Sequence, residues 1–432
     1  MTPTFVALFV FVASWSGVAF QSLAMVLVAV GLAIWFRSAP FSSLLADYRR
    51  SLFPRLALLL GIGWLVLALV SSVMNPWTAA AWPSFIPAYI WWALGPFTVA
   101  TLASAIVRLD RFKALAFRNT FSRYLWLVIA IACLIAASQY LFGWKIHGTE
   151  FIRSERRARL LFSHPLSLAY ILLLYFPLVG ALVVRNPRSR QAWAVAAALL
   201  FLVFVSSSRT VQAVLALLTG VFVLFGLGGR IRIIAIAVGL ALAVILVGTD
   251  NPVRQRFVGT IEQTEDREQY RYADDRIAFW AVHWDMFKER PLFGHGLSYR
   301  QDYLDRYYVA HGFPDFKKKY PAHNMYLQVM VNTGIAGLLV WLSRLAIDVM
   351  ACFAVIRGAA KQGSDRKLSS GNSWVGWVGI ATIAGMLLAG LTQNAFQDSA
   401  VRFHWTILEG LLLWFTSRQV VADGRDPVTK PV

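Results

Sequence analysis

One histidine and a few arginines are the residues whose types and positions in this chain could do chemistry. His323 and Asn324 directly precede a long apolar stretch, so the imidazole is expected at the mouth of a membrane helix. An imidazole at a membrane surface can exchange protons near neutral pH. Arg209 and Arg276 stand at the edges of two other helical stretches, and a guanidinium binds phosphate oxygens while staying charged. These residue types together predict proton transfer beside a bound anionic group.

Each of these residues also has a simpler role open to it. A guanidinium at a bilayer boundary can snorkel to the headgroups, which would explain Arg209. Arg276 can form an ion pair with Asp274 or Asp275. His323 can be an interfacial histidine whose hydrogen bonds are satisfied locally. The residues alone leave these alternatives open.

The composition decides which class of protein must position the candidate residues. Of the 432 residues, 58% are hydrophobic and 15% are charged, and the mean hydropathy is +0.58. Many apolar stretches approach or exceed ~18 residues, which is the length of a membrane-spanning helix. A closed membrane β-barrel would show short alternating stretches instead. We therefore expect an all-α polytopic membrane protein.

Hydropathy windows predict about twelve transmembrane helices. They run roughly over residues 5–20, 21–36, 55–73, 84–107, 124–142, 166–185, 192–206, 210–227, 231–248, 325–356, 374–393 and 403–417. The predicted parts are 1–249 with helices one to nine, 250–322 as a large loop, 323–420 with helices ten to twelve, and 421–432 as a tail. Within the loop, Arg276–Arg290 is expected to form an amphipathic helix on the membrane face. Its apolar residues at helical spacing are Ile277, Trp280, Val282, Trp284 and Phe287.

The net charge of +19 does not indicate nucleic acid, because the basic residues lie mainly in short loops between the predicted helices. Every even-numbered loop is basic, which predicts that these loops and both termini are cytoplasmic. The large loop, Arg157 and Arg159 then lie on the opposite side, where cations are unexpected. Phospholipid headgroups, pairing with Glu150 or Glu155, or an anionic ligand could each explain these cations.

No sequence signature indicates a metal or another cofactor. Cys133 and Cys352 lie inside apolar stretches, and the histidines lack metal-ligand spacing. Phosphate-binding glycine loops and a serine nucleophile elbow are also absent.

Three local patterns, with the helix count and the single large loop, resemble the O-antigen ligase family. The first is Ser-Ser-Ser-Arg-Thr over Ser206–Thr210. The second begins as Arg-x-x-x-Trp at Arg276 and runs on to Glu-Arg-Pro-Leu-Phe-Gly-x-Gly, which ends at Gly296. The third is His-Asn-x-x-Leu at His323, followed by Gly334.

A fourth pattern is looser. The family pattern Arg-x-x-Gly-x-Phe-x-x-Pro corresponds to Arg157–Pro165, where Leu160 stands in place of the glycine. This departure leaves open whether Arg157 or Arg159 fills the arginine's role.

The resemblance implies a fold related to polytopic glycosyltransferases that use lipid-linked donors. It implies transfer of a glycan from undecaprenyl diphosphate to a sugar hydroxyl of lipid A–core, on the periplasmic face of a bacterial inner membrane, with inversion and without a metal. His323 would be the general base, and Arg209 and Arg276 would hold the diphosphate. The further residues expected to bind substrate are Arg157, Arg159, His164, Asn324 and Trp280.

Other functions are also compatible with parts of the sequence. An O-antigen polymerase would use a second lipid-linked glycan as acceptor. A protein O-oligosaccharyltransferase usually carries a longer C-terminal extension. A lipid-linked glycan transporter would show internal repeats and charges at the midplane, whereas the charges are expected here at the external edge. Gln393, Asn394, Gln397 and Asp398 could contact sugar hydroxyls, although solvation of a helix end explains them more simply.

Overall fold

The computed structural model describes residues 52–75, 95, 96, 99, 129–143, 157–160, 162, 164–249, 275–296, 301–312, 321–361 and 373–422. The predicted helices 5–20 and 21–36, and nearly all of 84–107, lie outside these ranges. Within them the chain is helical and contains no strand. Five helices are long and apolar enough to cross a membrane: Leu52–Val73, Pro165–Arg185, Arg209–Gly226, Met325–Ala359 and Ser373–Gly390. The chain is therefore a helical membrane protein, as the composition predicts.

The described helices coincide with most of the predicted ones. Their bounds are α4 Leu52–Val73, α7 Pro165–Arg185, α8 Arg190–Ser206, α9 Arg209–Val221, the π-helical turn η2 Phe222–Gly226, α10 Gly229–Gly248, α12 Asp275–Glu289, α13 Gln301–Ala310, α14 Met325–Lys361, α15 Ser373–Gly390, the 3-10 turn η3 Ala395–Gln397 and α16 Ser399–Ala422. Two shorter apolar helices are Ile129–Phe142 and α8.

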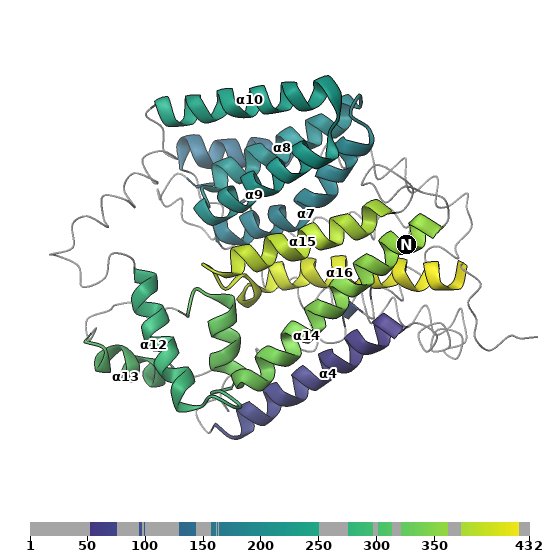
Figure 1. Cartoon of the computed structure of the whole chain (residues 1–432). Helices are drawn as coiled ribbons and strands as arrows, with labels where there is room; N and C mark the ends of the chain where they lie inside the picture. The colour runs from purple at the N-terminus through teal and green to yellow at the C-terminus, as the bar shows by residue number, and fades with distance from the viewer. Residues whose placement is uncertain are drawn as a thin grey trace, which may run out of the picture.

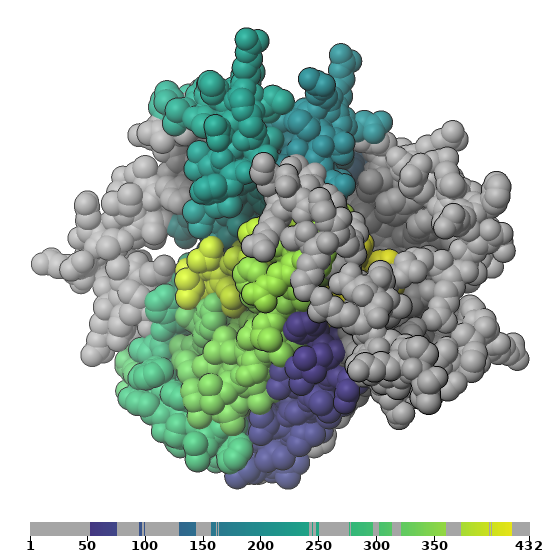
Figure 2. Space-filling model, turned by 45° about the vertical axis from the view of Figure 1, so that its right-hand side comes forward, coloured from purple at the N-terminus to yellow at the C-terminus, as the bar shows by residue number. Residues whose placement is uncertain are grey.

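Helix α14 is central to the bundle (Figure 1). It packs along α4 on one side and along α15 and α16 on the other, while α7 joins α15 to α8 and α9. Helices α12 and α13 lie at one end of the bundle, where α12 packs on the first part of α14. In Figure 2 the surfaces of α12, α14 and α4 adjoin on the lower part of the molecule. This arrangement brings α12 and α13 onto one end of the bundle.

The predicted continuous tenth helix is interrupted at Gly334. Its φ is 66° and its ψ is −169°, so α14 breaks there into two helical segments. The turn that follows α12 pairs with the backbone groups exposed by the break. His295 N–H donates to the Val331 carbonyl at 2.7 Å, and Ile335 N–H donates to the Pro291 carbonyl at 2.8 Å. The second and third sequence patterns are therefore two halves of one docking interaction.

The apolar face of α12 differs from the one that its sequence predicts. Its buried residues include Phe279, Val282 and Met286, which pack with α13 and with the start of α14. Trp284, which was expected on the apolar face, is 48% exposed. The protein neighbours of α12 therefore select its buried face.

An ion pair lies inside the bundle between α14 and α16. Arg344 Nε and Nη2 donate to the carboxylate of Glu409 at 2.7 and 2.8 Å, and both side chains are 2% exposed. Asp348, one turn after Arg344, is also buried. The expectation that charge is confined to the external edge is therefore wrong, because these two helices bury complementary charges against each other.

Candidate functional site

Four helices begin at the end of the bundle where α12 lies. They are α7, α9, α14 and α16, and the turn after α15 joins them. Asn324 Nδ2 links α14 to this turn by donating to the Leu391 carbonyl at 3.0 Å, and Thr210 of α9 shares a hydrogen bond of 2.7 Å with Thr392. Helix N-termini carry partial positive charge, which favours anions. The backbone therefore supplies a positive environment before any arginine is counted.

His323 lies directly before α14 and is held by two contacts. Its Nδ1 lies 2.7 Å from Gln393 Oε1, and its ring stacks on Phe279 of α12 with 5.3 Å between centroids. Its φ of 47° is unusual for a residue other than glycine. Because an amide oxygen only accepts, Nδ1 must carry the proton of this bond, and in the neutral ring the lone pair is then on Nε2.

The first turn of α14 is capped, which fixes the backbone beside His323. Asn324 Oδ1 accepts from Leu327 N–H at 3.0 Å, and Gln328 Oε1 accepts from Ala322 N–H at 3.0 Å. An asparagine in this position satisfies one of the free N–H groups of a helix start. Asn324 therefore acts as the cap of α14 and also connects it to the turn after α15.

The segment of Arg157 and Arg159 lies against the turn between α8 and α9, which carries Arg209. Arg157 Nε donates to the Ser206 carbonyl at 3.2 Å. Gln139 Oε1 accepts from the N–H groups of Arg159 and Leu160 at 2.9 and 2.8 Å. Leu160 itself has a φ of 53°, in the position where the family pattern has glycine. Leu160 adopts this left-handed conformation without a glycine, and the segment of both arginines lies against the turn that carries Arg209.

His164 caps the N-terminus of α7, because its Nδ1 accepts from Leu166 N–H at 3.1 Å. Desolvation lowers the pKa of His164, and the charge of Arg157 lowers it further, while Asp398 opposes the shift. Weaker effects of His323 and Arg159 act in the same direction as that of Arg157. These influences place His164 among the predicted site residues.

Asp398 connects α16 to this end of α7. Its Oδ1 accepts from Ala400 N–H at 2.8 Å and Val401 N–H at 3.3 Å, and its Oδ2 accepts from the hydroxyl of Ser167. The carboxylate therefore neutralises the N-terminus of α16. Its position in sequence suggested only solvation of a helix end.

Arg276 and Trp280 lie one turn apart on α12. Both side chains are partly buried. The charge of Arg276 acts on the hydroxyl of Tyr170, in the second turn of α7. Trp280 Nε1 is buried and has no hydrogen-bond partner among the described residues. Arg276 is thus brought toward the helix that His164 begins.

His283 lies on α12 one turn after Phe279, whose ring stacks on that of His323. It is fully buried, and its ring nitrogen Nδ1 lies 2.7 Å from the Phe279 carbonyl. Desolvation lowers the pKa of His283 to about 4, although its bond to Phe279 opposes the shift. A neutral histidine in this position supports α12 without adding charge to the site.

Several of these neighbours were missed or undervalued by sequence reasoning. Gln393 bonds to the imidazole of His323, Phe279 stacks on it, and the charge of Arg276 acts on Tyr170. Gln393 was considered only as a possible contact for sugar hydroxyls, and Tyr170 is hidden inside an apolar stretch. A polar side chain within a membrane helix is the signal that could have drawn attention to Tyr170.

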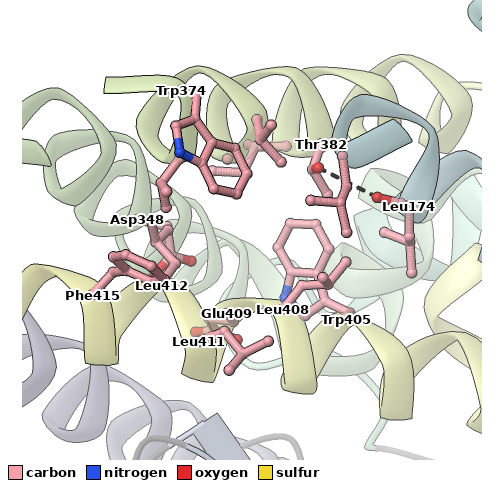
Figure 3. Close-up of a pocket in the computed structure, with 15 residues that line it drawn as sticks. Leu174, Asp348, Trp374, Thr382, Trp405, Leu408, Glu409, Leu411, Leu412 and Phe415 are labelled. Atoms are coloured by element: carbon pink, nitrogen blue, oxygen red, sulfur yellow. Dashed lines mark hydrogen bonds between the residues drawn. The ribbon is translucent and has the colours of Figure 1, made fainter. Parts of the chain in front are cut away.

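A separate cavity of about 140 Å³ lies between α7, α14, α15 and α16 (Figure 3). Its walls are mainly apolar and include Leu174, Trp374 and Phe415, while Asp348 and Glu409 contribute carboxylates. Neither carboxylate oxygen of Asp348 has a hydrogen-bond partner in the described part of the chain. None of the predicted site residues lines this cavity, so it is distinct from the end that holds His323.

These observations define a polytopic helical membrane protein in which His323, the segment of Arg157 and the turn of Arg209 lie at one end of the bundle. Residues 194–342 match the family model described as O-antigen ligase, which supports the resemblance that the sequence patterns indicate. The matched segment contains Arg209, Arg276 and His323, whereas Arg157 and Gln393 lie outside it. No curated protein matches the chain.

Proposed function

We propose that this protein is an O-antigen ligase, which transfers a glycan from undecaprenyl diphosphate to a sugar hydroxyl of lipid A–core on the periplasmic face of the inner membrane. The observation that carries the proposal is a continuous set of contacts. It runs from Arg157 along the turn of Arg209, through the Thr210–Thr392 bond, to Gln393 and His323. The family match supports a reaction on lipid-linked glycans, and the contacts support one shared site.

His323 is the proposed general base. As the acceptor oxygen attacks C1 of the donor sugar, its proton passes to Nε2, while Nδ1–H remains bonded to Gln393. General base catalysis typically contributes roughly a hundredfold to ten-thousandfold. Attack opposite the leaving group inverts the anomeric centre. The amide of Gln393 orients the ring but adds no negative charge to stabilise an imidazolium.

Arg209 and Arg276 are the proposed partners of the leaving diphosphate, with Arg157 or Arg159 as a third. When the C1–O bond breaks, its electron pair moves onto a diphosphate oxygen, and negative charge grows there. A prepositioned cationic donor contributes on the order of 3–4 kcal/mol to such a step. The helix N-termini around the site act in the same direction. His164, Asn324 and Trp280 are proposed substrate contacts.

The acceptor identifies the reaction, so the decisive assay offers two of them. Purified protein in vesicles receives lipid-linked glycan together with either lipid A–core or a second lipid-linked glycan. Product on lipid A–core supports a ligase, and elongation of the lipid-linked glycan alone would make the protein a polymerase. His323→Ala should abolish transfer in either case. Wild-type turnover by purified His323→Ala protein would remove the base from the mechanism.

The arginines need a control for simple loss of charge. Arg209→Gln and Arg276→Gln should each lower turnover by roughly a hundredfold or more. Arg185→Gln is the matched control, because Arg185 stacks on Trp374 at the far end of α7 and should leave transfer unchanged. We propose that no metal takes part, so EDTA should not alter the rate. Activity lost in EDTA and restored by a divalent ion would overturn that part.

A further inference from the structure

Tyr170 carries a buried hydroxyl group that no described residue of the bundle binds. The side chain is 2% exposed, and its hydroxyl has no hydrogen-bond partner among the described residues. Buried tyrosine hydroxyls usually find a partner, because leaving one unpaired is costly. A phenylalanine would fill the same space without that cost. The hydroxyl therefore needs an explanation other than packing.

The next tyrosine on the same helix shows the ordinary arrangement. Tyr175 lies between α7 and α16, and its hydroxyl shares a hydrogen bond of 2.9 Å with His404 Nδ1. That bond joins two helices, which is a structural role. Tyr170 is more deeply buried than Tyr175, yet its hydroxyl has no such bond to any described residue. The Tyr175 hydroxyl therefore links two helices, whereas the Tyr170 hydroxyl bonds to no described residue.

The surroundings of Tyr170 indicate which kind of ligand its hydroxyl can bind. Ser167, one turn earlier on α7, bonds to Asp398 at the site, and the charge of Arg276 acts on the Tyr170 hydroxyl. One turn along α12 from Arg276, Trp280 Nε1–H is a second buried donor without an acceptor. Within the described part of the chain these are two buried donors without acceptors, one influenced by the charge of Arg276 and the other one helical turn from it. Such donors match a ligand that is anionic and rich in acceptor oxygens.

We infer that Tyr170 donates a hydrogen bond to a phosphoryl oxygen of the lipid-linked donor's diphosphate, and that Trp280 Nε1 donates to the same group or to the adjoining sugar. This inference rests on the proposed function and adds specificity-determining donors to it. The hydroxyl oxygen is buried, so neighbouring side chains must separate as the diphosphate arrives. Tyr170 thus contributes to donor binding and not to the stability of the bundle.

The test compares binding with stability in purified full-length protein, using undecaprenyl diphosphate as the probe. Tyr170→Phe should weaken the Kd by about tenfold, the effect of one hydrogen bond to a charged group. Its melting temperature without lipid should equal or exceed that of the wild type, since an unpaired hydroxyl is removed. Tyr175→Phe should do the opposite, with a lower melting temperature and an unchanged Kd. Trp280→Phe should weaken binding as Tyr170→Phe does.

The outcomes of this test distinguish a failure of the Tyr170 inference from a failure of the proposed function. If the wild type binds undecaprenyl diphosphate, Arg276→Gln weakens binding and Tyr170→Phe binds as well as the wild type, the inference is wrong and the proposed function stands. If the wild type does not bind the probe, both fall. A Tyr170→Phe protein that melts well below the wild type would show that the hydroxyl supports the fold, and it would also overturn the inference.

Discussion

Replacing Gly334 with alanine should detach the turn after α12 from the break in α14. At a φ of 66° and a ψ of −169°, a conformation essentially restricted to glycine, a residue with a Cβ is disfavoured by roughly 1–3 kcal/mol. The new Cβ would also lie 2.2 Å from the backbone carbon and oxygen of Leu292. Backbone atoms cannot swing aside as a side chain can, so the turn must retreat.

The cost follows from the bonds that hold this turn. Four backbone hydrogen bonds cross the break: His295 to Val331, Gly296 to Asn332, Ile335 to Pro291 and Ala336 to Leu292, at 2.7, 2.9, 2.8 and 3.3 Å. Each contributes about 0.5–1.5 kcal/mol. With half of them lost and the backbone strain added, we expect a destabilisation of about 4 kcal/mol.

Gly63→Ala provides the matched control. A Cβ at Gly63, inside α4, would meet nothing within 4 Å, and alanine in a helix interior should stabilise by about 0.5–1 kcal/mol. Thermal unfolding in detergent and limited proteolysis after residue 290 would measure both variants. Gly334→Ala should unfold earlier, be cut faster and lose glycan transfer. If the two variants unfold and turn over alike, the break in α14 does not hold the loop in place.

Three further predictions follow from single contacts. Gln393→Ala should lower kcat by about tenfold with KM unchanged, because His323 loses the acceptor that orients it. Gln393→Glu keeps that acceptor and should retain activity. If Gln393→Ala and the wild type have equal kcat values in the transfer assay, Gln393 does not have this role. Arg344→Met should lower the free energy of unfolding by about 3–5 kcal/mol, because it leaves the buried carboxylate of Glu409 unpaired. Adding Glu409→Leu should recover most of this loss. Strictly additive losses in the double-mutant cycle would contradict an interaction between Arg344 and Glu409. His283 has a pKa of about 4 in the folded protein against an ordinary 6.5, so as the pH is lowered this histidine is protonated first in the unfolded chain. The free energy of unfolding should therefore fall by about 3 kcal/mol between pH 6.5 and pH 4. Melting temperatures of His283→Phe should fall less over that range, and an unchanged slope would refute the assignment.

The hydropathy windows located the described transmembrane helices because burial in lipid demands long apolar stretches, whatever the packing. The candidate residues could be grouped because topology assigned their loops to one side. In the structure, His164 lies beside Arg157 and Asp398, and the turn of Arg209 reaches that of Gln393. The roles of the individual side chains in catalysis remain predictions.

The features that were missed depend on pairs of segments and not on either segment alone. Gly334 reads as one more small residue in an apolar stretch until the Pro291 turn is placed against it. Arg344 and Glu409 stand 65 positions apart, so neither window reveals its partner. The buried side of α12 was predicted from its own periodicity, but α13 and α14 determine it. Tertiary contacts of this kind have no local signature.

The pairing of Arg344 with Glu409 also constrains how the protein is made. Since the arginine is synthesised first, a ribosome working at about 5–20 residues per second delivers the matching carboxylate several seconds later. During that interval α14 carries an uncompensated charge that lipid accepts poorly. Helix α16 therefore completes the bundle, and a nascent chain interrupted before it would present quality-control proteases with an unfinished membrane protein.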